Sequence, residues 1–169
     1  MKKKNFVLFV LAAALCSFTP GAEKVNSKEY GFSMEVPEGY TYQKDYGEMV
    51  PLLIYSPLEG ENDKFRESIN VTSEKFTGDA DTYYQANVMG MNNVLKDFKP
   101  SENGRTTING QPTHWLTYTF TYGELSLKVL AYCFSFNGRG YVVTCSASPE
   151  SFESYKATFE KVVGTFKKS

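Results

Sequence analysis

The stretch THWLTYTFTY, residues 113–122, alternates between two kinds of side chain. The even positions hold His114, Leu116, Tyr118, Phe120 and Tyr122, and the odd positions hold threonines and Trp115. Successive side chains of a β-strand point to opposite faces of a sheet, so a repeat of two residues predicts a strand. One face of this strand is largely apolar, and we expect it to be buried.

Two further strands are predicted downstream, over residues 125–136 and 141–147. Both are apolar on both alternating faces, which is typical of strands that are covered on both sides. Residues 98–147 are therefore expected to form an antiparallel meander. Its turns are signalled at Glu102-Asn-Gly104, Asn109-Gly110, Gly123-Glu124 and Asn137-Gly-Arg-Gly140.

Two amphipathic helices flank this meander. The first is expected over residues 79–95 with Asp79 or Asp81 as its N-cap. The second is expected to begin with Ser148 as its cap and Pro149 in its first turn. The predicted buried stripes are Tyr84, Val88, Met91 and Leu95 in the first helix, and Phe152, Tyr155, Phe159, Val162 and Phe166 in the second.

Upstream, short strands are expected over residues 30–36, 52–55 and 68–76. With two helices and about seven strands, the sequence predicts an α+β fold. We expect an antiparallel sheet of about six to seven strands sandwiched by helices.

The N-terminus has the pattern of a secretory signal peptide. Lys2 to Lys4 precede the apolar run 6–15, which is too short to span a bilayer. We therefore predict a signal peptide over 1–22, a short linker over 23–27 and a single domain over 28–169. The chain is then periplasmic or secreted. An alternative is a membrane-tethered lipoprotein in which Cys16 is lipidated, although Leu15 before it is larger than such processing prefers.

Charge excludes some partner classes. The chain has 18 basic and 19 acidic residues, and removal of three N-terminal lysines lowers the net charge from −1 to −4. The charges are mixed along the chain, so nucleic acid and anionic lipid are unexpected partners. No segment after the signal is apolar enough to predict a transmembrane helix.

Several segments resemble those of a known family. They are Tyr30-Gly-Phe-Ser-Met-Glu-Val-Pro-Glu-Gly-Tyr40, the strand-then-helix step 68–95, Asn109-Gly-Gln-Pro112, Gly140-Tyr-Val-Val-Thr144 and Val163-Gly-Thr-Phe-Lys167. Over about residues 28–168 the chain resembles PsbP-like domains and the DcrB-like bacterial envelope proteins of the same fold group.

The resemblance implies an α/β/α sandwich that binds proteins and rarely performs chemistry. The fold group includes PsbP subunits of photosystem II and a nuclear-import factor that binds the GTPase Ran. It also includes cytoplasmic chaperones, a role that an export signal disfavours. The group shares no catalytic motif, so the resemblance assigns no functional residue.

One row of residues could carry chemistry. If Gly123-Glu124 is a two-residue turn, His114 lies opposite Cys133. If Gly138–Gly140 is a three-residue turn, Cys133 also lies opposite Cys145 on the next strand. A thiolate of Cys133 activated by His114, or a metal site, would use this row. No orienting acid or further ligand is evident nearby in the pattern.

A structural interpretation of the same row is favoured. Directly opposed cysteines lie within disulfide range, and export permits a disulfide between Cys133 and Cys145. Two buried free thiols are the alternative. We therefore expect no catalytic, cofactor-binding or metal site in this chain.

The loop over residues 40–50 is the better functional candidate. Tyr40, Tyr42, Tyr46 and Met49 are of the kinds enriched at interface hot spots, although they could instead pack over a helix. The favoured hypothesis is a non-enzymatic exported binding or accessory protein that contacts an envelope protein through its loops. The alternatives are a small-ligand carrier with a pocket between sheet and helix, and a thiol or hydrolytic enzyme using His114 and Cys133.

Overall fold

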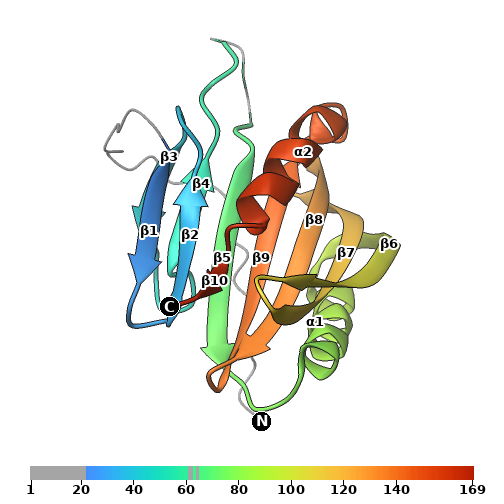
Figure 1. Ribbon diagram of the computed structural model, residues 1–169. Coiled ribbons are helices and arrows are strands. Elements are labelled where there is room, and N and C mark those ends of the chain that lie inside the picture. The colour runs from blue at the N-terminus through green and yellow to red at the C-terminus, as the bar shows by residue number, and fades with distance from the viewer. Residues whose placement is uncertain (1–21, 61–62, 64) are drawn as a thin grey trace.

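The computed structural model describes residues 22–60, 63 and 65–169, which form two antiparallel sheets and two helices (Figure 1). The larger sheet has seven strands in the order β3-β4-β5-β9-β8-β7-β6, and the smaller has the order β1-β2-β10. The predicted α+β fold is confirmed. The strands are β1 Glu23–Ser27, β2 Phe32–Val36, β3 Thr41–Lys44, β4 Leu52–Tyr55, β5 Ser68–Lys75, β6 Lys96–Ile108, β7 Gln111–Tyr122, β8 Leu125–Phe136, β9 Arg139–Ala147 and β10 Lys167–Lys168, and the helices are α1 Ala80–Val94 and α2 Phe152–Val163.

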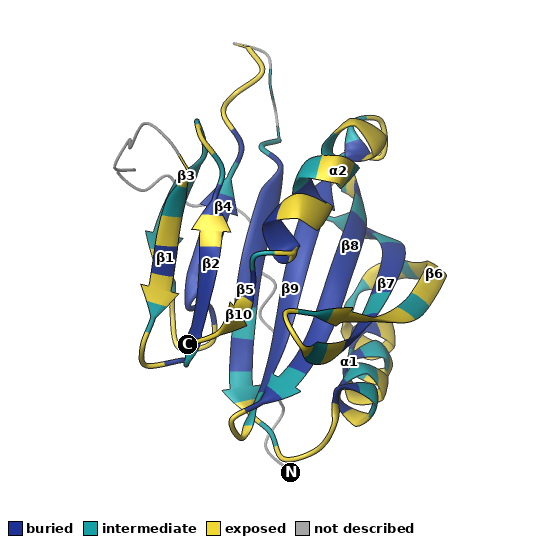
Figure 2. Cartoon of the chain, viewed as in Figure 1, coloured by how far each residue is buried: buried dark blue, intermediate teal, exposed yellow. Residues whose placement is uncertain are grey.

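Both faces of the larger sheet are covered, as the apolar pattern of residues 125–147 predicts. On one face, α2 and the smaller sheet enclose the main core, which includes Phe32, Phe134 and Phe159. On the opposite face, α1 packs on β7 and β8 around Met91 and Tyr118. Figure 2 shows the central strands β5, β9 and β8 as largely buried. The predicted burial of one face of residues 113–122 is confirmed, since Leu116, Tyr118 and Phe120 are buried in the cluster beneath α1.

Helix α1 begins where the sequence predicts, because the Asp79 carboxylate accepts a hydrogen bond from the Thr82 amide at 2.7 Å. Its buried stripe differs from the expected one. Tyr84, Val88 and Leu95 are only partly buried and flank the contact. A polar residue can lie in the centre because the Asn87 amide donates to the Tyr83 carbonyl at 2.8 Å. The buried residues are Ala80, Tyr83, Asn87 and Met91.

Helix α2 begins later than predicted. Ser148 does not cap it directly, but starts a turn in which its hydroxyl accepts from the Ser151 amide at 3.1 Å. The helix then starts at Phe152 with Ser151 at the N-cap position. Phe166 lies beyond the helix and is buried against Phe32 and Phe134, so this part of the predicted stripe is not helical.

Three segments form strands where loops or turns were expected. Residues 23–27, predicted as a linker, form β1 and pair with β2 from Glu23–Val36 to Ser27–Phe32. Part of the predicted loop 40–50 forms β3. The predicted turn at Glu102-Asn-Gly104 lies inside β6, where two register shifts absorb the extra residues without ending the strand.

The turn between β8 and β9 also differs from prediction. Phe136 pairs with Arg139, which leaves only Asn137 and Gly138 in the turn. Both have positive φ angles of 54° and 71°, as a type I′ turn requires. The expected three-residue turn would have added one residue and reversed which face each side chain of β9 occupies.

Within the described part of the chain, no helix is both long and apolar enough to cross a membrane. Cys16 and nearly all of the predicted signal peptide lie outside the described residues.

Candidate functional site

The four residues of the predicted partner-binding loop do not form one surface. Tyr40 precedes β3 and packs against the main core, where burial, with the Glu67 and Glu59 carboxylates nearby, raises its pKa to about 12. Tyr42 also packs on that core. Its hydroxyl donates to the Glu23 carboxylate at 2.6 Å, and this hydrogen bond is the main cause of a pKa raised to about 12. These two tyrosines therefore contribute to the packing of the main core.

Tyr46 and Met49 lie at the other end of β3, in the hairpin that leads to β4. Backbone hydrogen bonds run from the Asp45 amide to the Pro51 carbonyl and from the Tyr46 amide to the Val50 carbonyl. The Met49 carbonyl accepts from the Ser73 amide at 3.0 Å, which fixes the hairpin to β5. The Met49 side chain remains 39% exposed. The hairpin is therefore held in place while Met49 faces solvent.

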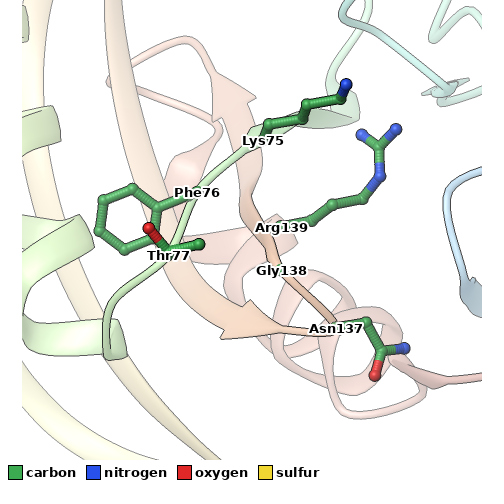
Figure 3. Close-up of a pocket in the computed structure, with 6 residues that line it drawn as sticks. All are labelled: Lys75, Phe76, Thr77, Asn137, Gly138 and Arg139. Carbon is green, nitrogen blue, oxygen red and sulfur yellow. The ribbon is translucent and has the colours of Figure 1, made fainter.

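A depression of about 400 Å³ lies at the same end of the sheet (Figure 3). The Phe76 amide donates to the Gly138 carbonyl at 3.0 Å, so the end of β5 is joined to the β8–β9 turn. Lys75 pairs with Arg139 across the strands, and Figure 3 shows their side chains extending toward the same side. The lining residues are Lys75, Phe76, Thr77, Asn137, Gly138 and Arg139.

The Arg139 guanidinium is held in place by two contacts. It lies 4.9 Å from the centre of the Tyr30 ring, and one of its nitrogens donates to the Ser73 hydroxyl at 3.2 Å. Neither Arg139 nor Lys75 forms an ion pair with any described residue. The Ser73 amide also binds the Met49 carbonyl, so the hairpin and the arginine meet at one residue.

We call Tyr46, Met49, Lys75, Phe76 and Arg139 the end surface. It combines an exposed methionine on the β3–β4 hairpin with two cations that form no ion pair with a described residue, an arrangement suited to an apolar segment carrying acidic groups. Sequence analysis missed Lys75, Phe76 and Arg139. The only sequence signals for them were the end of a predicted strand at 76 and the predicted turn at 137–140; the pairing of β5 with β9 brings residues 75 and 139 together.

The row predicted from His114 is partly confirmed. His114 lies opposite Cys133 because Gly123-Glu124 is a two-residue turn. Contrary to expectation, an acid does orient the histidine, since its Nδ1 lies 3.0 Å from the Asp81 carboxylate. Arg105 binds both oxygens of Asp81 at 2.8 and 2.9 Å, and the Tyr84 ring stacks on the imidazole at 3.6 Å.

The two cysteines do not form the expected disulfide. Cys133 lies opposite Val142, whereas Cys145 lies opposite Leu130, so the sulfurs are on opposite faces of the sheet and both are free. The two-residue turn at Asn137-Gly138 sets this register and so places the two cysteines on opposite faces. Burial raises the pKa of Cys133 to about 12 and raises that of Cys145 as well.

These thiols are protonated at neutral pH, and a protonated thiol is a poor nucleophile. Cys133 therefore lacks the activated form that a thiol enzyme would need, despite its neighbour His114. Across residues 22–60, 63 and 65–169, no group of three or more His, Cys, Asp or Glu side chains is placed to hold a metal ion. His114 and Cys133 therefore lie in a packed cluster, and Asp81 at its edge contacts both His114 and Arg105.

Solved structures with the same fold are known at low sequence identity. CyanoP, the cyanobacterial PsbP of Synechocystis sp. PCC 6803, matches with a TM-score of 0.65 and 15% identity over 94% of this chain and 99% of its own. LpqN of Mycobacterium tuberculosis, described as involved in cell envelope biogenesis, matches with a TM-score of 0.64 and 13% identity over 86% of this chain and 89% of its own. A protein of unknown function from Pseudomonas aeruginosa matches with a TM-score of 0.62 and 14% identity over 86% of this chain and 95% of its own.

No protein-family model and no curated protein sequence matches the chain. The narrower resemblance to DcrB-like proteins therefore stays a prediction. The structural matches extend over nearly the whole described chain and share its arrangement of sheet and helices. The chain has the PsbP-like fold.

Proposed function

We propose that this chain is an exported, non-enzymatic binding protein of the bacterial cell envelope that engages a protein partner through the end surface. Export rests on the signal-peptide pattern of residues 1–22. LpqN, a protein of the same fold, is described as involved in cell envelope biogenesis, which supports this setting.

One observation carries the choice of the end surface. Met49 is 39% exposed on a hairpin whose backbone is hydrogen-bonded on both sides. A preformed loop loses little conformational entropy on binding, so its contacts contribute more fully to affinity. An exposed methionine adapts its shape to an apolar partner group.

The neighbouring charges indicate the chemistry of the partner. Lys75 and Arg139 extend to the same side of the strands, and no described carboxylate pairs with them. Arg139 is already oriented by Tyr30 and Ser73 and can meet a carboxylate without first becoming ordered. The partner is therefore a polypeptide segment that combines an apolar side chain with aspartate or glutamate.

Site-specific photo-crosslinking tests this proposal in the native envelope. A photoreactive residue at position 49 reports on the end surface, and the same residue at position 58 is the matched control. Leu58 is also exposed, at 63%, but it follows β4 whereas Met49 precedes it, so the two positions lie at opposite ends of that strand. We expect a discrete crosslinked protein from position 49 and none from position 58. Equal products from both positions, or none from position 49, would overturn the proposal.

A further inference from the structure

A second depression, of about 260 Å³, lies between the larger sheet and α2. It is separate from the end surface and shares no residue with it. The β6–β7 hairpin bends across the sheet toward α2 (Figure 1). The Asn109 amide at its tip donates to the carbonyls of Gly164 and Phe166 at 2.8 and 2.9 Å. The residues that line this second depression are Thr106, Trp115, Thr117, Leu130, Tyr132, Lys156 and Glu160.

Trp115 forms an aromatic wall of this pocket. It is the only tryptophan in the chain, and it is partly exposed while its ring packs on the main core. It pairs with Gly104 of β6, where an added Cβ would lie 2.9 Å from the indole Nε1 and 3.0 Å from two ring carbons. A side chain at position 104 would therefore displace the indole. Glycine lets the ring lie close over the β6 backbone.

Two hydrogen-bond donors in the pocket have no partner. Tyr132 is 8% exposed, yet its hydroxyl makes no hydrogen bond to any described residue, and the same holds for the Trp115 indole N–H. Neither donor atom is fully enclosed by protein, so both are accessible from the pocket. A polar ligand in the pocket would supply acceptors for both donors.

Helix α2 adds a cation and an anion at the rim. Lys156 and Glu160 are one helical turn apart, so both side chains project over the same side of the pocket. The Thr106 and Thr117 hydroxyls add neutral polar groups from β6 and β7. Thr117 already bonds Ser101 and Glu102 within the protein, so the charged pair on α2 is the main polar feature, and it favours a ligand with hydroxyl groups over an apolar acyl chain.

The volume and the wall chemistry together select one class of ligand. Drug-sized sites measure roughly 300–1,000 Å³, so a pocket below that range holds about one ring. A pyranose has flat C–H faces that pack on an aromatic ring, and hydroxyl groups at its edge that both donate and accept. Those hydroxyls match the Glu160 acceptor and the Lys156, Tyr132 and Trp115 donors.

We infer that this pocket binds a single pyranose sugar ring, with a C–H face on Trp115 and its hydroxyls on Glu160, Lys156 and Tyr132. This inference goes beyond the proposed function and uses a different surface. The sugar can be free or the terminal ring of a glycan. In either case the recognised chemistry is a polyhydroxylated six-membered ring.

Tryptophan fluorescence tests the inference directly, because Trp115 is the sole source of the signal. The probes are D-glucose, D-galactose and N-acetyl-D-glucosamine, each titrated into the chain that begins at Glu23. We expect at least one to give a saturable change in emission, with a dissociation constant on the order of 1 mM for so small a ligand. Oligosaccharides ending in the same ring then distinguish a free sugar from a glycan terminus.

Two variants on α2 form a matched comparison. Glu160→Gln should weaken sugar binding about tenfold, because a hydroxyl loses a charged acceptor. Lys161→Gln changes an exposed neighbour outside the pocket and should leave the dissociation constant unchanged. The double variant Lys75→Gln/Arg139→Gln should also bind sugar normally, which separates this inference from the proposed protein-binding role.

Three results would overturn the inference. The first is no saturable change with any of the sugars up to about 50 mM, well above the expected constant, in protein with a native circular dichroism spectrum. The second is unchanged sugar affinity in Glu160→Gln. The third is an equal response to free amino acids, which would indicate a site for zwitterions.

Discussion

Cys133 lies opposite Val142 and Cys145 lies opposite Leu130, so the two cysteine side chains are on opposite faces of the β8–β9 pair. Both thiols are buried, one beneath α1 and the other beneath α2 and the smaller sheet. The sheet itself separates them, and no side-chain rotation can bring the sulfurs together.

Thiol counting tests this arrangement. The chain that begins at Glu23 should show two free thiols when it is unfolded without reductant. In the folded protein both should react slowly even near pH 9, where an ordinary cysteine is half ionised, because burial raises the pKa of Cys133 to about 12. Absence of free thiols in the unfolded protein would indicate the disulfide that this register excludes.

The register also shows how far the sequence could predict this region. A two-residue turn at Gly123-Glu124 placed His114 opposite Cys133 correctly. The next turn offered two glycines, Gly138 and Gly140, and choosing a three-residue turn put Cys145 on the wrong face. A shift of one residue moves every side chain of a strand to the other face of the sheet. The length of a single turn therefore determines which residues lie side by side on each face.

Gly140 was predicted to be a turn residue, but it lies in β9 and makes room for the Tyr83 ring of α1. A Cβ at this position would overlap the Tyr83 ring, which packs against β9 from α1. We expect Gly140→Ala to lower the free energy of unfolding by about 1–3 kcal/mol through overpacking. Gly90→Ala is the control, since nothing lies near that Cβ and alanine favours a helix by about 1 kcal/mol. Denaturant unfolding of both variants measures the contrast, and a neutral Gly140→Ala would contradict the packing of α1.

The Asp79 cap gives a prediction on pH. Its hydrogen bond from the Thr82 amide lowers the pKa of this carboxyl below the ordinary value of 3.8. A lowered pKa in the folded state means that the stabilisation is present above pH 3.8 and is lost as pH falls through the folded value. Asp79→Ala should therefore be less stable than wild type at pH 7, and the difference should shrink in acid.

Asp79→Asn is the informative control, because asparagine caps helices well but does not titrate. Its stability relative to Asp79→Ala should be nearly independent of pH. Thermal unfolding of the three proteins at several pH values measures both effects. A constant difference between wild type and Asp79→Ala down to pH 2 would contradict the cap.

Other features of the site could not be predicted from sequence. Asp81 lies 33 residues before His114, and only the position of α1 across β7 brings them together. Tyr40 and Tyr46 were predicted to share one loop, but the chain between them includes β3, and an extended strand carries residues six positions apart about 20 Å. That is why one tyrosine packs on the core and the other reaches the opposite end of the sheet.

Removing the charges from the end surface should weaken partner binding without unfolding the protein. Lys75→Gln/Arg139→Gln removes two cations that have no described ion-pair partner, so its melting temperature should fall by only a few degrees. The cost of losing the Arg139 contacts to Tyr30 and Ser73 is about 1 kcal/mol. Melting curves of the double variant check this before any binding measurement.

The most direct test of the central claim measures the crosslink yield from position 49 in cells that carry either wild-type charges or Lys75→Gln/Arg139→Gln. An acidic, apolar partner at the end surface predicts a discrete crosslinked protein with wild-type charges and at least about a tenfold lower yield without them. An unchanged yield in the folded double variant would contradict the account, because the partner would then bind without the two cations.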